Sequence, residues 1–408
     1  MNSDRNILYI SLTGMGEALG RSQVLEYLVE LSGEREICLI SFEREKDFDR
    51  LDEVRQLTER HGIRWHWLPY SNRYGIFSTL KQLCMGMRVG CRLVKERQIG
   101  IVHARSFIPA IMGMLLKKRY SLRLLFDIRG FAVDELVDRK RILKGALLYR
   151  VLRCIEDYLY RNADHIVTLT HRAREILDGR FRNGKRITVI PTCANKALFH
   201  PLSDSDRAAF KRSLGFDRDD TIIIHTGTVS NWYDFDSEVR LIRALMERDK
   251  TIRFLILNRH EHPFIQQVLG KYRLPPERVT VDECSFEAMH RYLNIADVSL
   301  FFIIPSYSKQ ASAPTKFAEN VACRLPSITN DNVGDMTYYL QHYRVGSLVS
   351  LETLKEDEER TADEVLDYLR RPRSRTEDFA ALFEKHFDKD MAVRKYQAIY
   401  RKLEEPGL

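Results

Sequence analysis

The sequence predicts an α/β protein with two Rossmann-like domains. Three observations support this fold class: short strand-like runs alternate with longer helical runs, the alternation stops once near residue 200 and then restarts, and the chain has 408 residues. Such alternation is typical of parallel sheets whose strands are joined by helices. A chain of this length exceeds one ordinary core, so we expect one domain over residues 1–200 and a second over residues 201–385.

The first domain is predicted to contain seven strands. They are residues 6–11, 37–42, 63–67, 100–103, 122–127, 165–170 and 187–190. Amphipathic stretches such as residues 22–31 and 147–160 lie between them and have apolar residues at helical spacing. Pro191, Pro201 and the polar residues 203–206 then break the pattern, which indicates a linker.

The same alternation restarts in the second domain. The predicted strands are residues 221–225, 253–257, 279–281, 298–303, 327–329 and 347–349. Residues 379–403 then have a helical pattern with Tyr396, Ile399, Tyr400 and Leu403 on one face. We expect a final helix packed on a neighbouring element, and we assign residues 386–408 to it.

The composition indicates a globular protein with a buried core, since 44% of the residues are hydrophobic and 30% are charged. The longest apolar stretch, residues 108–116, is too short to span a bilayer, and the first residues lack a secretion signal. The seven cysteines include no C-x-x-C pair, so neither a disulfide framework nor a metal site is predicted. We therefore expect a cytoplasmic protein.

The net charge of +8 is concentrated in one block. Residues 61–200 contain 27 Lys and Arg against 10 Asp and Glu, a local net charge of +17 that leaves −9 for the rest of the chain. An anionic partner for the first domain is the resulting hypothesis. Basic amphipathic stretches such as residues 144–161 favour an anionic membrane, reached peripherally at the inner face of the cytoplasmic membrane, over nucleic acid. A solvated basic surface without a partner is the alternative.

The strongest candidate site follows the predicted strand 298–303, where a loop of small residues leads into a helix. Its candidate residues are Ser312, Pro314, Thr315, Lys316 and Glu319. Free backbone N–H groups at a helix start bind phosphate, and Lys316 adds a positive charge there. Glu319 shares a helix face with Lys316 and could accept hydrogen bonds from ribose hydroxyls. The alternative is a capped surface helix on which Lys316 and Glu319 form a local ion pair.

A second candidate is the glycine loop after the first strand, with Gly14, Gly16 and Gly20. Glycines permit a tight turn and close approach of a ligand. The spacing G-x-G-x-x-x-G departs from the dinucleotide pattern, and no acidic residue clearly ends the second predicted strand, so a hydride-transfer enzyme is disfavoured. A simple strand-to-helix turn is the alternative.

Polar residues also follow other predicted strands. His103, together with Asp127 and Arg129, lies at strand ends of the first domain, where these residues could position a sugar and an acceptor; a buried structural histidine is the alternative. In the second domain Gly227 with Thr228 could admit a phosphate or sugar.

Arg259 offers another cation at the same sheet edge. Asp234 and Asp236 have the acid-x-acid form of some metal-diphosphate sites, but they fall where a helix should start, so we interpret them as capping residues.

These motifs resemble the GT-B fold glycosyltransferases of the family 4 type. The resemblance extends over nearly the whole chain and is carried by residues 14–20, 101–103, 163–168, 189–201, 296–326 and 396–400. It implies two facing Rossmann-like domains, the first for the acceptor and the second for the nucleotide-sugar, with the final helix returning to the first. It also implies that Glu319 binds the donor ribose, that Lys316 with Thr315 binds the diphosphate, and that anomeric configuration is retained.

The implied activity transfers a sugar from a UDP- or GDP-type donor, without a metal or other cofactor, to a glycan or lipid-linked acceptor in bacterial surface polysaccharide or glycoconjugate synthesis. The chain departs from the family pattern at three places. Ala311 stands where the first of two paired glutamates is usual, the Arg and Lys common after the first strand of the second domain are absent, and Arg129 stands where many members have histidine. Arg259 and Lys316 are left to neutralise the leaving group.

Two other classes of protein remain open at this point. A GT-B-like sugar-nucleotide epimerase or phosphorylase would bind the nucleotide with the same residues. A non-catalytic partner subunit is compatible with Ala311, which stands where a glutamate is usual. The residues do not specify the nucleotide base, the sugar or the acceptor.

Overall fold

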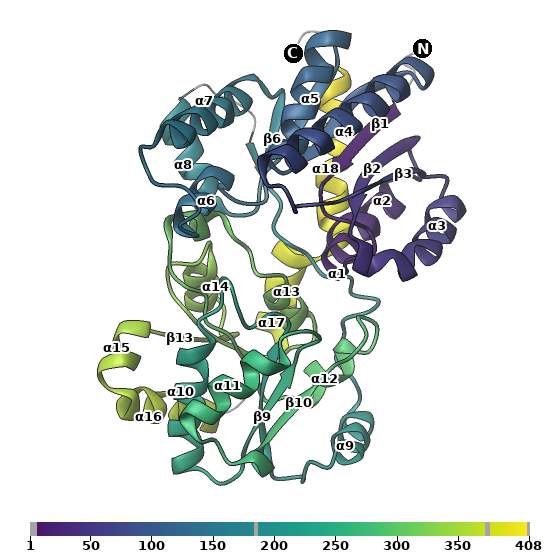
Figure 1. The fold of residues 1–408 in the computed structure, drawn as a ribbon. Helices are drawn as coiled ribbons and strands as arrows, with labels where there is room; N and C mark the ends of the chain where they lie inside the picture. Colours follow the sequence, from purple (N-terminus) through teal and green to yellow (C-terminus); the bar gives the residue numbers. More distant parts are fainter. Residues whose placement is uncertain (1–5, 183–186, 372–375, 406–408) are drawn as a thin grey trace. The chain divides into compact units, whose positions relative to one another are not determined.

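The chain folds into two compact units, each built on a parallel sheet (Figure 1). The computed structural model describes residues 6–182, 187–371 and 376–405. The first unit comprises Met1–Pro191, Tyr307–Ser312 and Lys389–Leu408, and the second comprises Thr192–Ser306 and Ala313–Asp388. The predicted α/β class with two Rossmann-like sheets is confirmed.

The sheet of the first unit has seven strands in the order β3-β2-β1-β4-β5-β6-β7. They are β1 (Asn6–Ser11), β2 (Ile37–Glu43), β3 (Arg64–Pro69), β4 (Ile99–Arg105), β5 (Arg123–Asp127), β6 (His165–Thr168) and β7 (Ile187–Val189). Every residue of β2 and β4 is buried, as expected for central parallel strands covered on both faces. Their continuous apolar runs explain why these strands are evident in the sequence.

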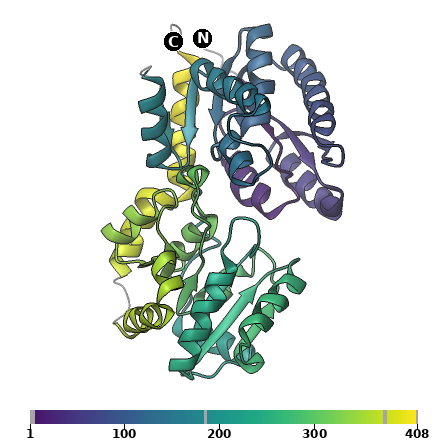
Figure 2. The ribbon, with the colours of Figure 1, turned by 60° about the vertical axis from the view of Figure 1, so that its left-hand side comes forward.

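Helices cover both faces of this sheet. They are α1 (Ala18–Gly20), α2 (Glu26–Leu31), α3 (Leu51–Arg60), α4 (Ile76–Glu96), α5 (Phe107–Tyr120), α6 (Ala132–Asp138), α7 (Leu147–Asn162), α8 (His171–Phe181) and α18 (Lys389–Glu404). The strand order reverses after β3, and right-handed crossovers change face at such a reversal, so α4, α5 and α7 lie on the face opposite α2. The final helix α18 packs against α2 and β4, which confirms its predicted return to the first domain (Figures 1 and 2).

The second unit has six strands in the order β10-β9-β8-β11-β12-β13. They are β8 (Thr221–Thr226), β9 (Ile252–Leu257), β10 (Val279–Asp282), β11 (Val298–Leu300), β12 (Ser327–Asn330) and β13 (Gly346–Val349). Ile223 belongs to one core cluster, whereas Ile222 and Ile224 belong to another. Because successive side chains of a strand point to opposite faces, the two clusters fill the two sides of the sheet.

The helices of the second unit come from the crossovers and from the chain segments that flank them. They are α9 (Asp204–Ser213), α10 (Phe235–Arg248), α11 (His262–Tyr272), α12 (Met289–Ile295), α13 (Thr315–Ala322), α14 (Met336–His342), α15 (Leu351–Glu356), α16 (Glu358–Arg370) and α17 (Thr376–Leu382). Across all the residues the structure describes, no helix combines the length and apolarity needed to cross a membrane.

Three bounds differ from the predictions. The first unit ends at Pro191 rather than at residue 200. Residues 307–312 were assigned to the second domain, but Tyr307–Ser312 packs within the first unit, where Ala311 joins the main core cluster. The final helix begins at Lys389 rather than at residue 379 or 386, because a π-helical segment, Phe383–Phe387, ends at the extended residue Asp388.

Candidate functional site

The second unit has a scaffold for a ligand where its strand order reverses, between β8 and β11. Open α/β sheets bind ligands at such a reversal, beyond the carboxyl ends of the strands. Here the segments that follow the two strands are joined: the backbone N–H of Asp234 donates to the Phe302 carbonyl (2.9 Å), and that of Ile304 donates to the Trp232 carbonyl (2.8 Å). Tyr233 is therefore held at the reversal point by its neighbours on both sides.

Lys316 lies on this scaffold with no partner for its charge. The side chain is on α13, the residue is 7% exposed, and its Nζ atom lies 3.9 Å from the centroid of the Tyr233 ring. Within the described structure, Nζ has no hydrogen-bond partner. Burial lowers the pKa of Lys316 to about 8, although Glu238, Glu319 and Glu261 oppose the shift. The local ion pair with Glu319, which was the alternative interpretation, is not formed.

Glu319 lies one turn further along α13 and is half-buried. Burial raises the pKa of its carboxyl to about 7, and the nearby charge of Lys316 only partly offsets the rise. A carboxyl group with this pKa is about half ionised at pH 7, and in its ionised form it can accept hydrogen bonds from hydroxyl groups.

The start of α13 has no side-chain cap. Pro314 is the N-cap, Thr315 is the first helical residue, and no side chain caps the helix. The N-terminal N–H groups of an uncapped helix attract negative charge. Ser312, by contrast, belongs to the first unit, and its N–H donates to the Lys309 carbonyl (3.1 Å).

The loop after β8 is fixed by two acids that the sequence analysis did not single out. Glu238 lies 2.6 Å from Nδ1 of His225, whose Nε2 lies 3.1 Å from the Thr228 carbonyl. Glu261 accepts hydrogen bonds from the N–H of Val229 (3.0 Å) and from the hydroxyl of Ser230. Both acids occupy the first turn or the N-cap of a helix, a common place for acids, so no sequence signal marked them.

Gly227 and Thr228, at the turn held by these acids, are exposed. Gly227 has φ of 83°, and no atom lies within 4 Å of a Cβ placed on it, so the space above the turn is open. Arg259 follows β9 at the same sheet edge and is exposed, with one guanidinium nitrogen donating to the Cys284 carbonyl (3.2 Å). The structure thus brings the predicted residues Gly227, Thr228, Arg259, Lys316 and Glu319 to one edge of one sheet.

Asp234 caps α10, as the sequence analysis predicted. Its carboxylate accepts the backbone N–H of Ser237 (3.2 Å), and Asp236 pairs with Lys271 (2.5 Å). Both acids therefore have partners within the second unit.

The polar residues predicted at the strand ends of the first unit form a buried network beneath α18. His103 and Asp127 are 1% and 0% exposed. The hydroxyl of Tyr396 donates to Asp127 (3.2 Å), and that of Tyr400 lies 2.7 Å from Nδ1 of His103. Burial raises the pKa of Asp127, but Arg129, His103 and Arg105 outweigh it and hold that pKa at about 2.

This geometry gives His103 and Asp127 a structural role, and their catalytic role stays a prediction. Arg129 lies 3.4 Å from Asp127 and keeps 16% of its side chain exposed. It is thus the member of the predicted trio whose side chain still reaches solvent.

An acid at the end of β2 accepts hydrogen bonds from the backbone of the glycine loop in the first unit. Glu43 is the last residue of that strand, which corrects the prediction that no acid ends it. Its carboxylate accepts the N–H groups of Met15 (2.8 Å) and Gly16 (3.1 Å), and a Cβ on Gly14 would lie 2.5 Å from it. Packing against Glu43 therefore explains Gly14, and a Cβ on Gly16 would lie 3.0 Å from the Asp47 carbonyl oxygen, while ligand binding by Gly14 and Gly16 stays a prediction.

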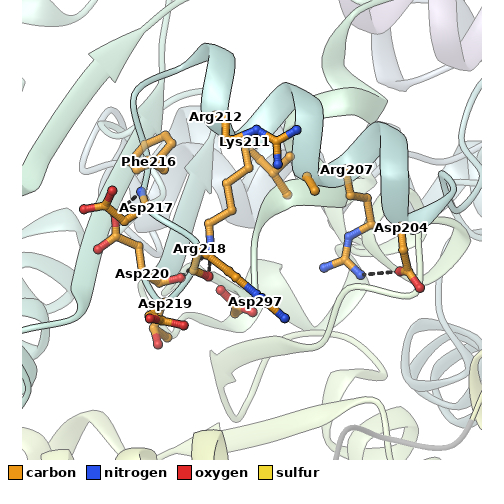
Figure 3. A pocket seen from close by; sticks show the side chains of 13 residues that line it. Asp204, Arg207, Lys211, Arg212, Phe216, Asp217, Arg218, Asp219, Asp220 and Asp297 are labelled. Atoms are coloured by element: carbon orange, nitrogen blue, oxygen red, sulfur yellow. Dashed lines mark hydrogen bonds and ion pairs between the residues drawn. The ribbon is translucent and has the colours of Figure 1, made fainter.

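A cavity of about 660 Å³ lies at the opposite, amino-terminal edge of the second sheet (Figure 3). Two of its charged side chains have partners: Lys211 donates to the carbonyls of Arg218 (3.0 Å) and Asp220 (2.6 Å), and Asp220 pairs with Arg253 (2.9 Å). These contacts tie α9 and the following loop to the sheet. The cavity lies away from the carboxyl edge, so it is not the candidate site.

Comparison with protein families gives one match. A family model described as a glycosyl transferase 4-like domain matches residues 24–193. Comparison with curated protein sequences gives no match.

Solved structures share the fold over nearly the whole chain. Sucrose-phosphate synthase from Thermosynechococcus elongatus is similar with a TM-score of 0.70 and 16% identity, covering 98% of this chain and 99% of that chain. HepE from Anabaena in complex with UDP-glucose has a TM-score of 0.65 and 13% identity, covering 97% and 99%. A putative UDP-N-acetylglucosamine 2-epimerase from Listeria monocytogenes has a TM-score of 0.59 and 14% identity, covering 97% and 95%.

These likenesses show that the chain has the GT-B fold. Together with the family match in the first unit, they confirm the resemblance to GT-B glycosyltransferases of the family 4 type.

Proposed function

We propose that this chain is a glycosyltransferase that moves a sugar from a nucleotide-diphosphate donor to a glycan or lipid-linked acceptor. The observation that carries the proposal is the buried, unpaired ammonium of Lys316 beside the uncapped start of α13. A buried charge without a partner is costly, and a diphosphate would supply the missing countercharge. The donor is of the UDP or GDP type, and the structural likeness to HepE, whose structure contains UDP-glucose, supports a uridine nucleotide.

The proposed chemistry needs stabilisation of the leaving group. When the bond between the anomeric carbon and the phosphate oxygen breaks, negative charge grows on the departing nucleotide diphosphate. Lys316, the N–H groups of α13 and the exposed Arg259 provide positive charge without requiring a metal. Glu319 accepts hydrogen bonds from the donor ribose.

We further propose that the anomeric configuration is retained. The acceptor hydroxyl attacks on the face that the phosphate leaves, and its proton passes to the departing phosphate oxygen. No side chain has to act as the base in this reaction. Arg129, the partly exposed member of the first-unit network, would help to position the acceptor.

The acid missing at Ala311 has a structural explanation. Ala311 is 1% exposed and packs in the core cluster of the first unit, so a carboxylate there would be buried among apolar side chains. We propose that recognition of the donor sugar in this chain does not use an acid at this position. A role in bacterial surface polysaccharide or glycoconjugate synthesis, at the inner face of the cytoplasmic membrane, fits the basic block of the first unit.

Calorimetry with UDP, GDP and ADP tests the proposal directly. We expect one nucleotide to bind with a 1:1 stoichiometry, and its sugar derivative to be consumed only when an acceptor is present. Turnover of the nucleotide-sugar alone would instead support an epimerase. The likeness to the putative epimerase from Listeria is the observation that favours this second class. Absence of binding by all three nucleotides would support a non-catalytic subunit.

A further inference from the structure

The first unit exposes large apolar side chains at the starts of two crossover helices, α4 and α7, which both pack against α5. Those at and near the start of α4 are Ile76, Phe77 and Leu80, which are 62%, 74% and 52% exposed. Those before and within the start of α7 are Leu143, Leu147 and Val151, which are 79%, 78% and 46% exposed. We call these six side chains the apolar edge. Isolated exposed apolar residues are ordinary, whereas several within one or two helical turns are typical of an interaction site.

The apolar edge lies on one face of the unit. The helix α5 packs against both α4 and α7, and all three follow the reversal in strand order, so they cover the same side of the sheet (Figure 1). Crossover helices run back from the carboxyl ends of the strands, and α4 and α7 therefore both begin at the carboxyl edge. The exposed side chains thus gather at the edge of the sheet where ligands of α/β proteins bind.

The exposed side of α7 carries apolar residues that recur at helical spacing. Leu147, Val151, Cys154 and Tyr158 are exposed and recur along one side of the helix. The opposite side carries Leu159, which is buried in the core. The helix therefore has two apolar sides, and the outward one is largely exposed, with Lys118 Nζ 4.7 Å from the centroid of the Tyr158 ring.

The charges around the apolar edge are mainly basic. Lys81, Arg88, Lys144 and Arg150 are exposed on or beside the same helices. The acids of α7 are already paired with arginines. Glu156 is buried and pairs with Arg153 (2.6 Å), and Asp157 pairs with Arg180 (2.6 Å). The apolar edge is therefore surrounded mainly by positively charged side chains.

We propose that the apolar edge is a docking surface that inserts into an anionic lipid bilayer. Apolar side chains on amphipathic helices enter the boundary between headgroups and acyl chains, while Lys and Arg contact anionic headgroups. A second copy of this chain fits less well, because a twofold interface would bring the same basic patch against itself. Nucleic acid fits less well because it offers no apolar phase for Phe77 or Leu147. The proposal adds the contact surface to the membrane location proposed above, but it does not depend on the transferase chemistry.

Sedimentation with vesicles tests the docking surface on the full chain. We expect binding to vesicles that contain phosphatidylglycerol and weak binding to vesicles of phosphatidylcholine alone. The double variant F77S/L147S should bind the anionic vesicles at least about tenfold more weakly, because two inserted side chains are lost. The variant F264S is the matched control, since Phe264 is an exposed aromatic residue of the second unit, and it should bind as the unchanged chain does.

Charge is tested separately with the double variant K144S/R150S. It should lose affinity for anionic vesicles, and added salt should weaken the unchanged chain more than this variant. Because all four substituted residues are exposed, both double variants should melt at the temperature of the unchanged chain. If F77S/L147S fails to fold, the single variant L147S serves the same purpose.

Three results would overturn the proposal. One is unchanged vesicle binding by F77S/L147S, and another is equal binding to neutral and anionic vesicles. The third is a dimer in solution that F77S/L147S converts to a monomer while no vesicles are bound, which would identify a second copy as the occupant. Nucleotide calorimetry without lipid keeps the outcomes separate: a chain that binds nucleotide but not vesicles contradicts the docking surface alone.

Discussion

Each unit buries a charged residue near the carboxyl edge of its sheet, but the partners of the two charges differ. In the first unit Asp127 is fully buried and is surrounded by Arg129, Arg105 and the Tyr396 hydroxyl. In the second unit the ammonium of Lys316 is almost as deeply buried, and it has an aromatic ring but no hydrogen-bond partner within the described residues. Asp127 thus has its charged and hydrogen-bonding partners within the chain, whereas Lys316 has no such partner among the described residues.

This difference separates structural from functional charge. A buried group whose partners are all present stabilises the fold, and removing one partner leaves the others unpaired. A buried group without a partner costs stability, so it persists where a ligand supplies the partner. Depth of burial alone does not distinguish the two cases.

The largest effect is expected from Lys316→Met. It should weaken binding of the nucleotide diphosphate about 100-fold, because a buried ammonium contacting phosphate contributes on the order of 3 kcal/mol. The same change should raise the unfolding temperature, since it removes a charge whose pKa burial has lowered from 10.5 to about 8. Calorimetry and thermal unfolding measure the two effects.

Lys271→Met is the matched control in the same unit. Lys271 pairs with Asp236 at an exposed position, so its loss should leave both nucleotide affinity and unfolding temperature unchanged. If Lys316→Met binds nucleotide normally, or is strongly destabilised, the charge is structural and the comparison between the units fails.

Asp127→Asn should have the opposite pattern. It removes the charge that Arg129 and Arg105 share, and we expect a loss of about 3 kcal/mol in the free energy of unfolding of the first unit. Nucleotide affinity at the second unit should not change. Urea unfolding followed by tryptophan fluorescence reports the loss, because Trp65 and Trp67 lie in the first unit. Normal stability with lost turnover would instead establish the predicted catalytic role.

The sequence analysis predicts the alternation of strands and helices because buried parallel strands are continuous apolar runs. It also locates Lys316 and Glu319, since a helix start after a buried strand is a local feature. It does not reveal Glu261, which accepts a hydrogen bond from Val229 in the loop after β8. It also does not reveal Glu43, which lies on β2 and accepts a hydrogen bond from Met15 in the glycine loop. Such contacts join residues distant in sequence, and their acids look like ordinary helix-start or strand-end acids.

The burial of His103 has the same origin. Its pattern at a strand end suggested a ligand contact, but Tyr396 and Tyr400 of α18 cover it from the far end of the chain. This cover comes from the last helix, so the sequence around His103 does not reveal it.

A smaller effect is expected from Glu319→Gln, which tests the assignment of the ribose. The change should lower the affinity for the nucleotide roughly tenfold, because hydrogen bonds to a charged acceptor contribute about 1.5 kcal/mol or more. A 2′,3′-dideoxy nucleotide should bind the unchanged chain weakly and should bind Glu319→Gln no worse than the ribonucleotide does. If the dideoxy compound loses the same factor in both proteins, Glu319 does not contact the ribose.

The smallest effect is a pH dependence of nucleotide affinity that only the second unit should produce. The carboxylate of Glu319 must be ionised to accept two hydroxyl hydrogen bonds, and its pKa is about 7, so affinity should fall as the pH decreases below 7. The ammonium of Lys316 must keep its proton to bind phosphate, and its pKa is about 8, so affinity should fall as the pH increases above 8. An anion raises that pKa, and binding near pH 8 should therefore take up a proton.

The two limbs of this profile belong to different residues and can be removed one at a time. Glu319→Gln should abolish the loss on the acidic side, and Lys316→Met should abolish the loss on the alkaline side. Asp127→Asn should leave both limbs in place, because the first-unit network has its own partners and a carboxyl pKa of about 2. Calorimetry between pH 6 and pH 9 in buffers of different ionisation enthalpy measures affinity and proton uptake together. A profile that Asp127→Asn alters and Lys316→Met does not would reverse the roles assigned to the two units.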